Sequence, residues 1–434
     1  MRPTHLEINL SQLKQNLENI RKRVSPAKVL VVLKANAYGH GVDGVAPFIA
    51  PFADYLGVAI VEEAIHLRKM GITTPILVMG GTLPEQLPDF FEYDLTLAAA
   101  SLDLLTAANH LAESTRKRIK THLKIDTGME RIGVREYEAE ALIEKSFACS
   151  RLVEVEGIFT HFANSETSSL PDAMSRLHWR AAQVLRGGAL PPKQAPAKLD
   201  AARASGEEHT CPGGRCQGER PRNDMVESTR NTQHATRNNI VSASLQLERF
   251  QEVLSIYEKR SEPQPAIRHT ANSGATLLMP ESYFDMVRPG VLFYGVYPAR
   301  DIAKTIDVKP ALTWKSQVIF SKVTQPGRGV SYGSLWQAEA ESRIVTVPCG
   351  YADGYFRRMT NQTRVLINGK SYPQVGRICM DQFMVNVGAD DVKVGDEVTL
   401  MGNGISPEEL ADWAGTNEYE VMTNISARVP RVFV

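Results

Sequence analysis

Apolar and polar stretches alternate regularly over the first 290 residues of the chain. Short apolar runs of strand length lie at residues 28–34, 55–60, 75–80, 94–99, 119–126, 153–161, 266–272 and 284–290. Helical patterns lie between such runs, as in FQEVLSIYEK, where Phe250, Val253, Leu254 and Tyr257 follow the spacing of one helix face. Strands that are apolar throughout are typical of parallel sheets covered on both sides, and eight of them close a barrel. The pattern therefore predicts an α/β fold with an N-terminal TIM-like (β/α)8 barrel over residues 1–305.

The pattern changes after residue 305. Strand-like runs such as ALTWKSQVIFSKV, RIVTVPCG, TRVLING, QFMVNVG and DEVTLMG follow one another, many of them separated by turn residues such as Pro-Gly and Asn-Gly. The one clear helix is SPEELADWAG, with Ser406 placed as its N-cap and Pro407 at its first position. Residues 306–434 are therefore predicted to form a C-terminal, mainly β domain.

The segment from about residue 187 to 239 fits neither domain. It is rich in Gly, Pro, Arg, Asn and Glu, nearly empty of aliphatic residues and longer than an ordinary loop. Its Cys211 and Cys216 lack the Cys-x-x-Cys spacing and have no second pair, so a metal site is not expected. We expect a disordered insertion that interrupts the barrel domain.

Charge and cysteine content exclude several classes of protein. The 49 basic and 49 acidic residues balance, which argues against a nucleic-acid partner. The N-terminal stretch MRPTHLEINL lacks the apolar core of a signal peptide, and no run approaches the length of a membrane span. Five scattered cysteines suit a reducing compartment. We expect a cytoplasmic protein without a membrane partner.

Polar residues gather at the predicted C-terminal ends of the barrel strands, where enzymes of this fold place their chemistry. Lys34 directly follows the apolar run LVVL, and burying an ammonium costs free energy unless its charge is paired or removed. Either Lys34 marks where the strand reaches water, or it is neutralised by forming a covalent bond. Other predicted strands end in Lys124, Asp126 and Arg131, in His161, in His269, Asn272 and Ser273, and in Arg288. Such a set on one rim favours a functional site.

An ordered set of motifs gives this site a specific interpretation. LVVLKANAYGHG resembles the cofactor-lysine signature of alanine racemases, which use pyridoxal 5′-phosphate (PLP). The resemblance continues through LKIDTGMERIGV, GIFTHFANSE, TANSGAT, FDMVRPGVLFYG, VSYGS, VPCGYADGYFR, VGRICMDQF and YEVMTNISARVPR. It covers nearly the whole chain in order and is interrupted only by the insertion.

The resemblance implies a cofactor site on the barrel. Lys34 would hold PLP covalently, and Arg288 would face the pyridine nitrogen and keep it unprotonated. The other cofactor-binding residues implied are Tyr38, His161, Asn272, Ser273, Gly290, Val291 and Tyr419, several of them at the phosphate. No metal is implied.

The resemblance also implies a two-base reaction on alanine. Lys34 would exchange a proton on one face of the substrate carbon, and Tyr332 of a partner subunit would do so on the other. His161, Arg288 and His269 would form a hydrogen-bonded chain that supports Tyr332. Each active site would therefore be shared within a homodimer, and its product, D-alanine, would supply peptidoglycan.

Substrate residues follow from the same motifs. Arg131 and the backbone of Met380 would hold the substrate carboxylate, and Tyr351, Tyr419 and Met380 would leave room for about a methyl group. Lys124 matches a position that carries a carbamate in family members; unmodified, it would repel Arg131 or pair with Asp126. The sequence leaves both states open. Supporting roles are implied for Arg377 and Asp381, and Arg377 and Arg431 match positions of the access corridor.

Rival functions share parts of this pattern. Small PLP-carrier proteins have the same barrel and lysine but lack the second domain, whereas this chain has Tyr332 and Met380. Decarboxylases of the same fold place a carboxylate where Arg288 stands. A racemase of broad specificity is disfavoured by the bulk of Tyr351 and Tyr419.

Overall fold

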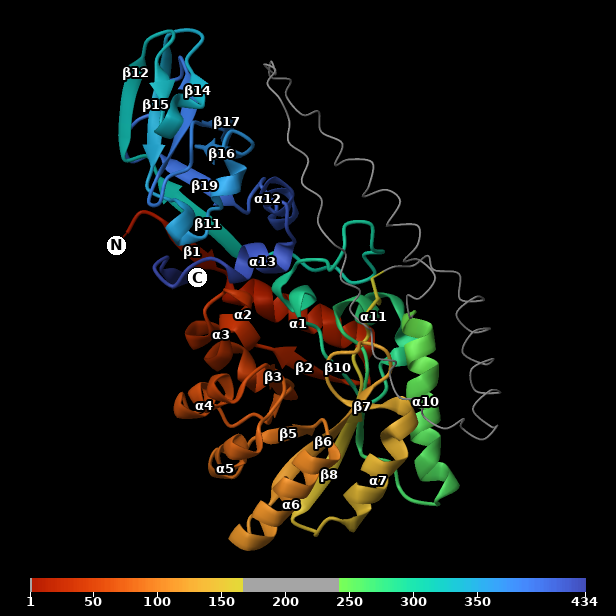
Figure 1. Ribbon diagram of the computed structural model, residues 1–434. Coiled ribbons are helices and arrows are strands. Elements are labelled where there is room, and N and C mark those ends of the chain that lie inside the picture. Colours follow the sequence, from red (N-terminus) through yellow and green to blue (C-terminus); the bar gives the residue numbers. More distant parts are fainter. Residues whose placement is uncertain (1, 167–241) are drawn as a thin grey trace, which may run out of the picture. The chain divides into compact units, whose positions relative to one another are not determined.

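The computed structural model describes residues 2–166 and 242–434 (Figure 1). The predicted insertion at about residues 187–239, with Cys211 and Cys216, lies outside the described residues. No helix in the described part of the chain combines the length and the apolar character that crossing a membrane requires.

Eight parallel strands form the predicted barrel, in the order β10-β2-β3-β4-β5-β6-β8-β9. Backbone hydrogen bonds from Asp285 to Arg268 (3.0 Å) and from Arg288 to Ala271 (2.9 Å) connect the segments of β9 and β10, so the ring is nearly closed. The strands are β2 (Lys28–Val32), β3 (Tyr55–Val58), β4 (Ile76–Val78), β5 (Thr96–Ala99), β6 (Ile119–Asp126), β8 (Val153–Phe159), β9 (Ile267–His269) and β10 (Met286–Val287). Each lies within one of the eight apolar runs, which confirms the predicted fold class.

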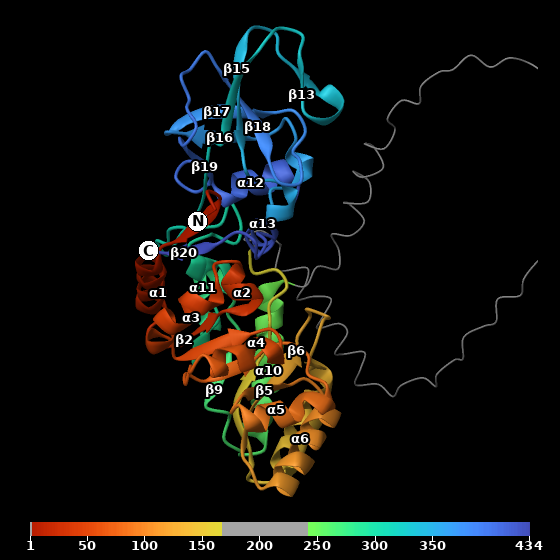
Figure 2. The ribbon, with the colours of Figure 1, turned by 90° about the vertical axis from the view of Figure 1, so that its left-hand side faces the viewer.

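Helices between the strands cover the outside of the barrel, as α4, α5 and α6 do in Figures 1 and 2 and α7 does in Figure 1. The first helix is capped by Asn9, whose side chain accepts a hydrogen bond from the backbone of Gln12 (2.8 Å). The helices are α1 (Leu10–Val24), α2 (Lys34–Tyr38), α3 (Val42–Ile49), α4 (Val61–Lys69), α5 (Leu87–Glu92), α6 (Leu102–Thr115), α7 (Ala139–Ala148), α10 (Ala243–Lys259) and α11 (Ser273–Leu278). A short strand, β7 (Val134–Arg135), pairs with β6.

A second sheet forms the predicted β domain, in the order β12-β15-β18-β17-β16-β19-β11-β1-β20. Its strands are β1 (His5–Ile8), β11 (Leu312–Gln317), β12 (Phe320–Thr324), β15 (Ser342–Val347), β16 (Arg364–Ile367), β17 (Lys370–Val375), β18 (Phe383–Gly388), β19 (Glu397–Met401) and β20 (Arg431–Phe433). A separate hairpin joins β13 (Gly329–Val330) to β14 (Trp336–Gln337), and the helices are α12 (Pro407–Ala414) and α13 (Glu418–Thr423). As predicted, Ser406 caps α12 by accepting a hydrogen bond from Glu409 (3.1 Å).

The N-terminal strand lies in this second sheet, although the sequence interpretation placed residues 1–305 in the barrel. β1 pairs antiparallel with β11, with Leu6 opposite Trp314, and parallel with β20. Leu6 and Ile8 are buried and alternate with more exposed residues, the pattern of a strand with one face on a core. Both views show the two chain ends close together (Figures 1 and 2). The β domain is thus built from both ends of the chain.

Candidate active site

The short segment α2, which begins at Lys34 just after β2, is a left-handed turn and not a regular helix. Residues 35–38 have φ values of 54°, 53°, 53° and 51°, a region that costs non-glycine residues about 1–2 kcal/mol each. Glu63 holds this turn, because its carboxylate accepts hydrogen bonds from the backbone N–H groups of Ala35 (2.6 Å) and Ala59 (2.9 Å). Gly39 continues the turn, and a Cβ there would meet the backbone oxygen of Met422 at 2.1 Å. Strain of this kind is retained mainly where a function needs it.

The side chain of Lys34 lines a cavity of about 380 Å³ at the C-terminal ends of the strands. Burial, followed by the positive charge of Arg131, lowers the pKa of its amine. A lowered pKa favours the neutral, nucleophilic amine. The cavity contains the residues that the sequence predicted for the cofactor: Lys34, Tyr38, His161, Asn272, Ser273, Arg288, Gly290, Val291 and Tyr419.

Hydroxyl and backbone N–H groups meet at one end of the cavity. The Ser273 hydroxyl accepts hydrogen bonds from the backbone of Gly290 (2.9 Å) and of Leu292 (3.4 Å). A Cβ at Gly290 would lie 2.5 Å from the Tyr38 hydroxyl, so the close approach of these groups requires a glycine. The Asn272 side chain caps α11 by accepting from Ala275 (3.1 Å). This end of the cavity has the donors that an anionic phosphate requires.

Arg288 lies at the inner wall of the cavity and is 3 % exposed. Its guanidinium donates to Nδ1 of His269 (2.7 Å) and to the backbone oxygens of Thr160 (2.7 Å) and Thr270 (3.1 Å). Burial lowers the pKa of Arg288 to about 9, which leaves it protonated at neutral pH. The structure thus holds a buried cation in the cavity wall, in hydrogen-bond contact with His269, one of the two histidines predicted beside it.

A hydrogen-bonded chain continues from Arg288 through the barrel interior, and the sequence interpretation missed its inner members. Since Arg288 donates to Nδ1 of His269, Nε2 of His269 carries a proton and donates to Nδ1 of His122 (2.8 Å). Nε2 of His122 then donates to the carboxylate of Glu156 (3.2 Å), which also accepts from Tyr55. Arg288 at one end of the chain and the carboxylate of Glu156 at the other thus fix the tautomers of both histidines.

A one-residue irregularity explains why Glu156 was missed. The register between β6 and β8 shifts at this point, with Thr121 opposite Val155 and His122 opposite Gly157. A bulge breaks the alternation by which inward residues are read from a sequence. His122 could have been found, because it lies two positions before Lys124 and therefore on the same face of β6.

Lys124 is 4 % exposed at the end of β6, and the charges of three other cationic side chains (Arg288, Arg131 and Lys34) act on it. Burial, followed by the charges of Arg288 and Arg131, lowers the pKa of Lys124 to about 7. Asp126 does not pair with it, because its carboxylate accepts hydrogen bonds from the backbone of residues 128–131. No carboxylate in the described part of the chain forms an ion pair with Lys124.

Apart from Tyr419, which lines the barrel cavity, predicted residues of the β domain form a second cluster. Tyr332, Met380 and Asp381 line a groove that contains no residue of the barrel. The Ser331 hydroxyl donates to the backbone oxygen of Arg377 (2.7 Å), which joins the loop of Tyr332 to that of Met380. Tyr332 is 69 % exposed and Met380 53 %. Within one chain, the structure does not bring Tyr332 to Lys34.

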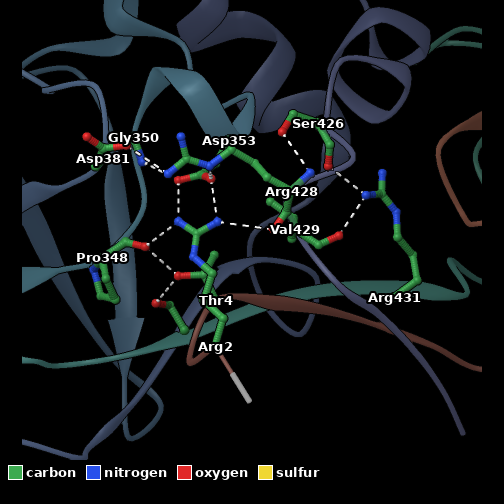
Figure 3. A network of polar contacts seen from close by, with 11 residues as sticks. Arg2, Thr4, Pro348, Gly350, Asp353, Asp381, Ser426, Arg428, Val429 and Arg431 are labelled. Atoms are coloured by element: carbon green, nitrogen blue, oxygen red, sulfur yellow. Dashed lines mark hydrogen bonds and ion pairs between the residues drawn. The ribbon is translucent and has the colours of Figure 1, made fainter.

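Tyr351 belongs to the same cluster, whereas Arg431 has a structural role. The backbone N–H of Tyr351 donates to the oxygen of Cys379 (3.1 Å), beside Met380. The guanidinium of Arg431, expected in the access corridor, donates to the backbone oxygens of Ser426 and Val429 (Figure 3). It also donates to the backbone oxygens of Gly39 and Ile425. Arg431 therefore holds the C-terminal segment and the turn after Lys34 together.

The barrel cavity fits PLP. The hydroxyl groups of Ser273 and Tyr38 beside Gly290 suit a phosphate, a buried arginine suits a pyridine nitrogen, and Lys34 offers an amine of lowered pKa. These features define an enzyme of the barrel class that can hold an anionic cofactor beside a reactive lysine.

Comparison with known proteins identifies the family within this class. Models of the alanine racemase N-terminal domain (residues 8–199 and 231–298) and C-terminal domain (residues 311–433) match the chain. The chain belongs to the alanine racemase family of enzymes. It is 36 % identical to the alanine racemase of Carboxydothermus hydrogenoformans over 441 residues, covering 100 % of both chains. The corresponding identity with the Halothermothrix orenii enzyme is 35 %, covering 100 % of this chain and 97 % of that one.

Solved structures agree with this assignment. The chain is similar to the alanine racemase of Clostridium difficile, with a TM-score of 0.79, 32 % identity and coverage of 100 % of this chain and 96 % of that one. The Bacillus anthracis alanine racemase with bound L-Ala-P gives a TM-score of 0.77 and 30 % identity, covering 100 % and 95 % of the two chains. The family predicted from the sequence motifs is thereby confirmed.

Proposed function

We propose that this protein interconverts L-alanine and D-alanine with PLP as its cofactor, in active sites shared between two copies of the chain. The observation that carries the proposal is the division of the site. Lys34 lies in a barrel cavity, whereas Tyr332 and Met380 lie exposed in a separate groove of the β domain. A second copy that placed its groove over the cavity would bring both proton-exchanging groups to one substrate.

The bound cofactor would supply the withdrawal of electrons from the substrate α-carbon, which makes its proton easier to remove. Lys34 would then take or return that proton on one face, and Tyr332 of the partner copy would do so on the other. Arg131 would hold the substrate carboxylate by paired N–H bonds, together with the backbone of Met380 from the partner copy. By the same family resemblance, the D-alanine formed would supply peptidoglycan.

Exposed apolar side chains around Tyr332 support the proposed dimer. Ile319, Phe320 and Val323 line the same groove and are 40–54 % exposed. Large apolar side chains gathered on a surface mark contact sites. A homodimer would cover them and complete both sites.

A direct assay tests the function. Purified protein supplied with PLP should remove the circular dichroism of L-alanine solutions, and serine or larger amino acids should react more slowly. An unchanged signal with L-alanine at equilibrium times would refute the proposal, and equal rates with large side chains would refute the assigned specificity.

Replacing Arg288 is expected to change the reaction as well as slow it. Arg288→Lys retains a cation but loses the fork that contacts His269 and two carbonyl groups, so the pyridine nitrogen would be held less firmly in its unprotonated state. We expect racemisation to fall by about 10²-fold and the pyruvate formed per racemisation to rise. A lactate dehydrogenase assay measures the pyruvate. Arg260→Gln, at an exposed ion pair of the barrel, is the control. An unchanged ratio of pyruvate to racemised alanine would contradict the role of Arg288.

We further propose that Lys124 carries a carbamate. A pKa of about 7 leaves much of the amine neutral near neutral pH, and the neutral nitrogen can bond to the carbon of CO₂ while releasing one proton. The resulting anion would replace a cation that repels Arg131 and Arg288. With ¹³CO₂ we expect a carbamate NMR signal that is absent in Lys124→Ala and present in Lys69→Ala, a surface lysine. Because protonation of the amine blocks the reaction, the signal should weaken below about pH 7. A signal that persists in Lys124→Ala would contradict this assignment.

A further inference from the structure

A buried carboxylate, Asp353, lies between two arginines in the β domain (Figure 3). It is next to the loops of Tyr351 and Met380, called the substrate loops below. The Asp353 side chain is fully buried, and the two terminal guanidinium nitrogens of Arg2 donate to its two oxygens, at 2.6 and 2.8 Å. Nε of Arg428 lies 2.9 Å from the same carboxylate. Hydrogen bonding with Asp353 raises the pKa of Arg2. A paired arginine–carboxylate contact of this kind fixes geometry as well as charge.

The carboxylate of Asp353 shapes the loop that contains Tyr351. It accepts a hydrogen bond from the backbone of Gly350 (3.0 Å), which closes the turn of Tyr351–Asp353. Arg2 also donates to the backbone oxygen of Pro348 (3.1 Å), at the start of the loop. The side chain of Arg2 therefore holds this loop at both ends, at Pro348 and at Asp353.

That loop in turn holds the segment of Met380. The backbone N–H of Ala352 donates to the oxygen of Met380 (3.0 Å). A Cβ at Gly350 would meet that oxygen at 2.4 Å, so the two loops are in close backbone contact. Arg428 adds a second link, because it binds both Asp353 and Asp381 (2.7 Å), the residue after Met380. The position of Met380 thus depends on the cluster around Asp353.

The N-terminal strand explains how Arg2 reaches this cluster. β1 lies in the sheet of the β domain, and the backbone N–H of Leu6 donates to the oxygen of Pro430 (2.8 Å). Thr4 also donates to the oxygen of Pro348 (2.6 Å) and is hydrogen-bonded to Ser316 (2.9 Å). The segment before the barrel is therefore anchored so that Arg2 faces Asp353.

We propose that Arg2 is a positioning residue for the substrate. Acting through Asp353, it fixes the loops that present Tyr351 and the backbone of Met380 to alanine. The proposal rests on the proposed function, in which these two residues contact the substrate. It assigns a role in substrate binding to a residue that lies in neither substrate loop.

Arg2→Gln tests the proposal. Arg428 and the Gly350 N–H still contact Asp353 in this variant, so no buried carboxylate is left alone. We expect KM for L-alanine to rise about tenfold with kcat within about threefold of wild type, since binding and not proton transfer is disturbed. Arg2→Lys, which keeps the charge but not the paired contact, should give an intermediate KM. Hydrogen exchange of the backbone at residues 348–355 should accelerate in Arg2→Gln.

Arg364→Gln is the matched control. Arg364 makes a similar two-pronged contact with Glu409 (2.8 and 3.1 Å) in the same domain, and its removal should leave KM unchanged. If the wild type is active and the KM of Arg2→Gln is unchanged, the role of Arg2 is overturned. Loss of bound PLP or of the dimer in Arg2→Gln would also overturn it, since either would show a general structural role. A wild type unable to racemise alanine would instead refute the proposed function.

Discussion

Replacing Lys34 by alanine is expected to abolish racemisation and the covalent attachment of PLP together. The amine of Lys34 has a lowered pKa because it is buried near Arg131, and it is the residue assigned both to hold the cofactor and to exchange a proton. Loss of a positioned proton-transfer group alone slows a reaction by at least about 10²-fold. Wild-type protein treated with borohydride should yield PLP on the peptide that contains Lys34, and the variant should yield none.

A surface lysine of the same barrel provides the control for this experiment. Lys69→Ala, at the exposed end of α4, should retain both activity and the labelled Lys34 peptide. Covalent PLP on another lysine of Lys34→Ala, with racemisation preserved, would contradict the assignment. Because alanine removes the amine but leaves the hydrogen bonds of Glu63 to Ala35 and Ala59, the turn itself should persist in the variant.

The strands and their polar ends could be predicted because they depend on local patterns. A buried parallel strand is apolar throughout, and the residue at its C-terminal end is the first that can reach the site. Lys34, Lys124 and Arg288 were found in this way, and the structure places them at one end of the barrel. The helix cap at Ser406 is equally local, since a hydroxyl followed by Pro and two glutamates favours a helix start.

Features that depend on distant contacts could not be predicted. The left-handed turn at residues 35–38 contradicts the preferences of alanine and tyrosine, and contacts from Glu63 hold it in place. Glu156 enters the barrel interior through a register shift that the sequence does not mark. β1 was assigned to the barrel because it precedes a barrel helix, but its partners lie more than 300 residues later.

Tyr332→Phe is expected to produce an asymmetric defect. The substitution removes only the hydroxyl of a side chain that is 69 % exposed in the single chain, so folding should be unaffected. Since the equilibrium constant between the enantiomers is one, kcat/KM for racemisation must fall equally in both directions. The asymmetry should therefore be measured as exchange of the α-hydrogen in D₂O. We expect exchange of the α-hydrogen of L-alanine to slow by about 10²–10³-fold. The α-hydrogen of D-alanine, which would face Lys34, should still exchange.

Tyr137→Phe, at an exposed tyrosine of the barrel, should exchange both enantiomers at the wild-type rate. Equal losses of exchange from L- and D-alanine in Tyr332→Phe would refute the assignment of one group to each face. If only the exchange from D-alanine were lost, the assignment would be reversed, with Tyr332 acting on D-alanine and Lys34 on L-alanine.

Mixing the two inactive variants should restore activity if Tyr332 acts in a partner copy. In a hybrid dimer of Lys34→Ala and Tyr332→Phe, one site combines the intact Lys34 of one chain with the intact Tyr332 of the other, while the second site lacks both groups. Random exchange of subunits makes half of the dimers hybrids, so we expect recovery of about a quarter of the wild-type activity. If Tyr332 instead acted on the Lys34 of its own chain, no site in the mixture would be complete and no activity would return. The measurement therefore separates a shared site from a site within one chain, which is the division seen between the barrel cavity and the groove of Tyr332.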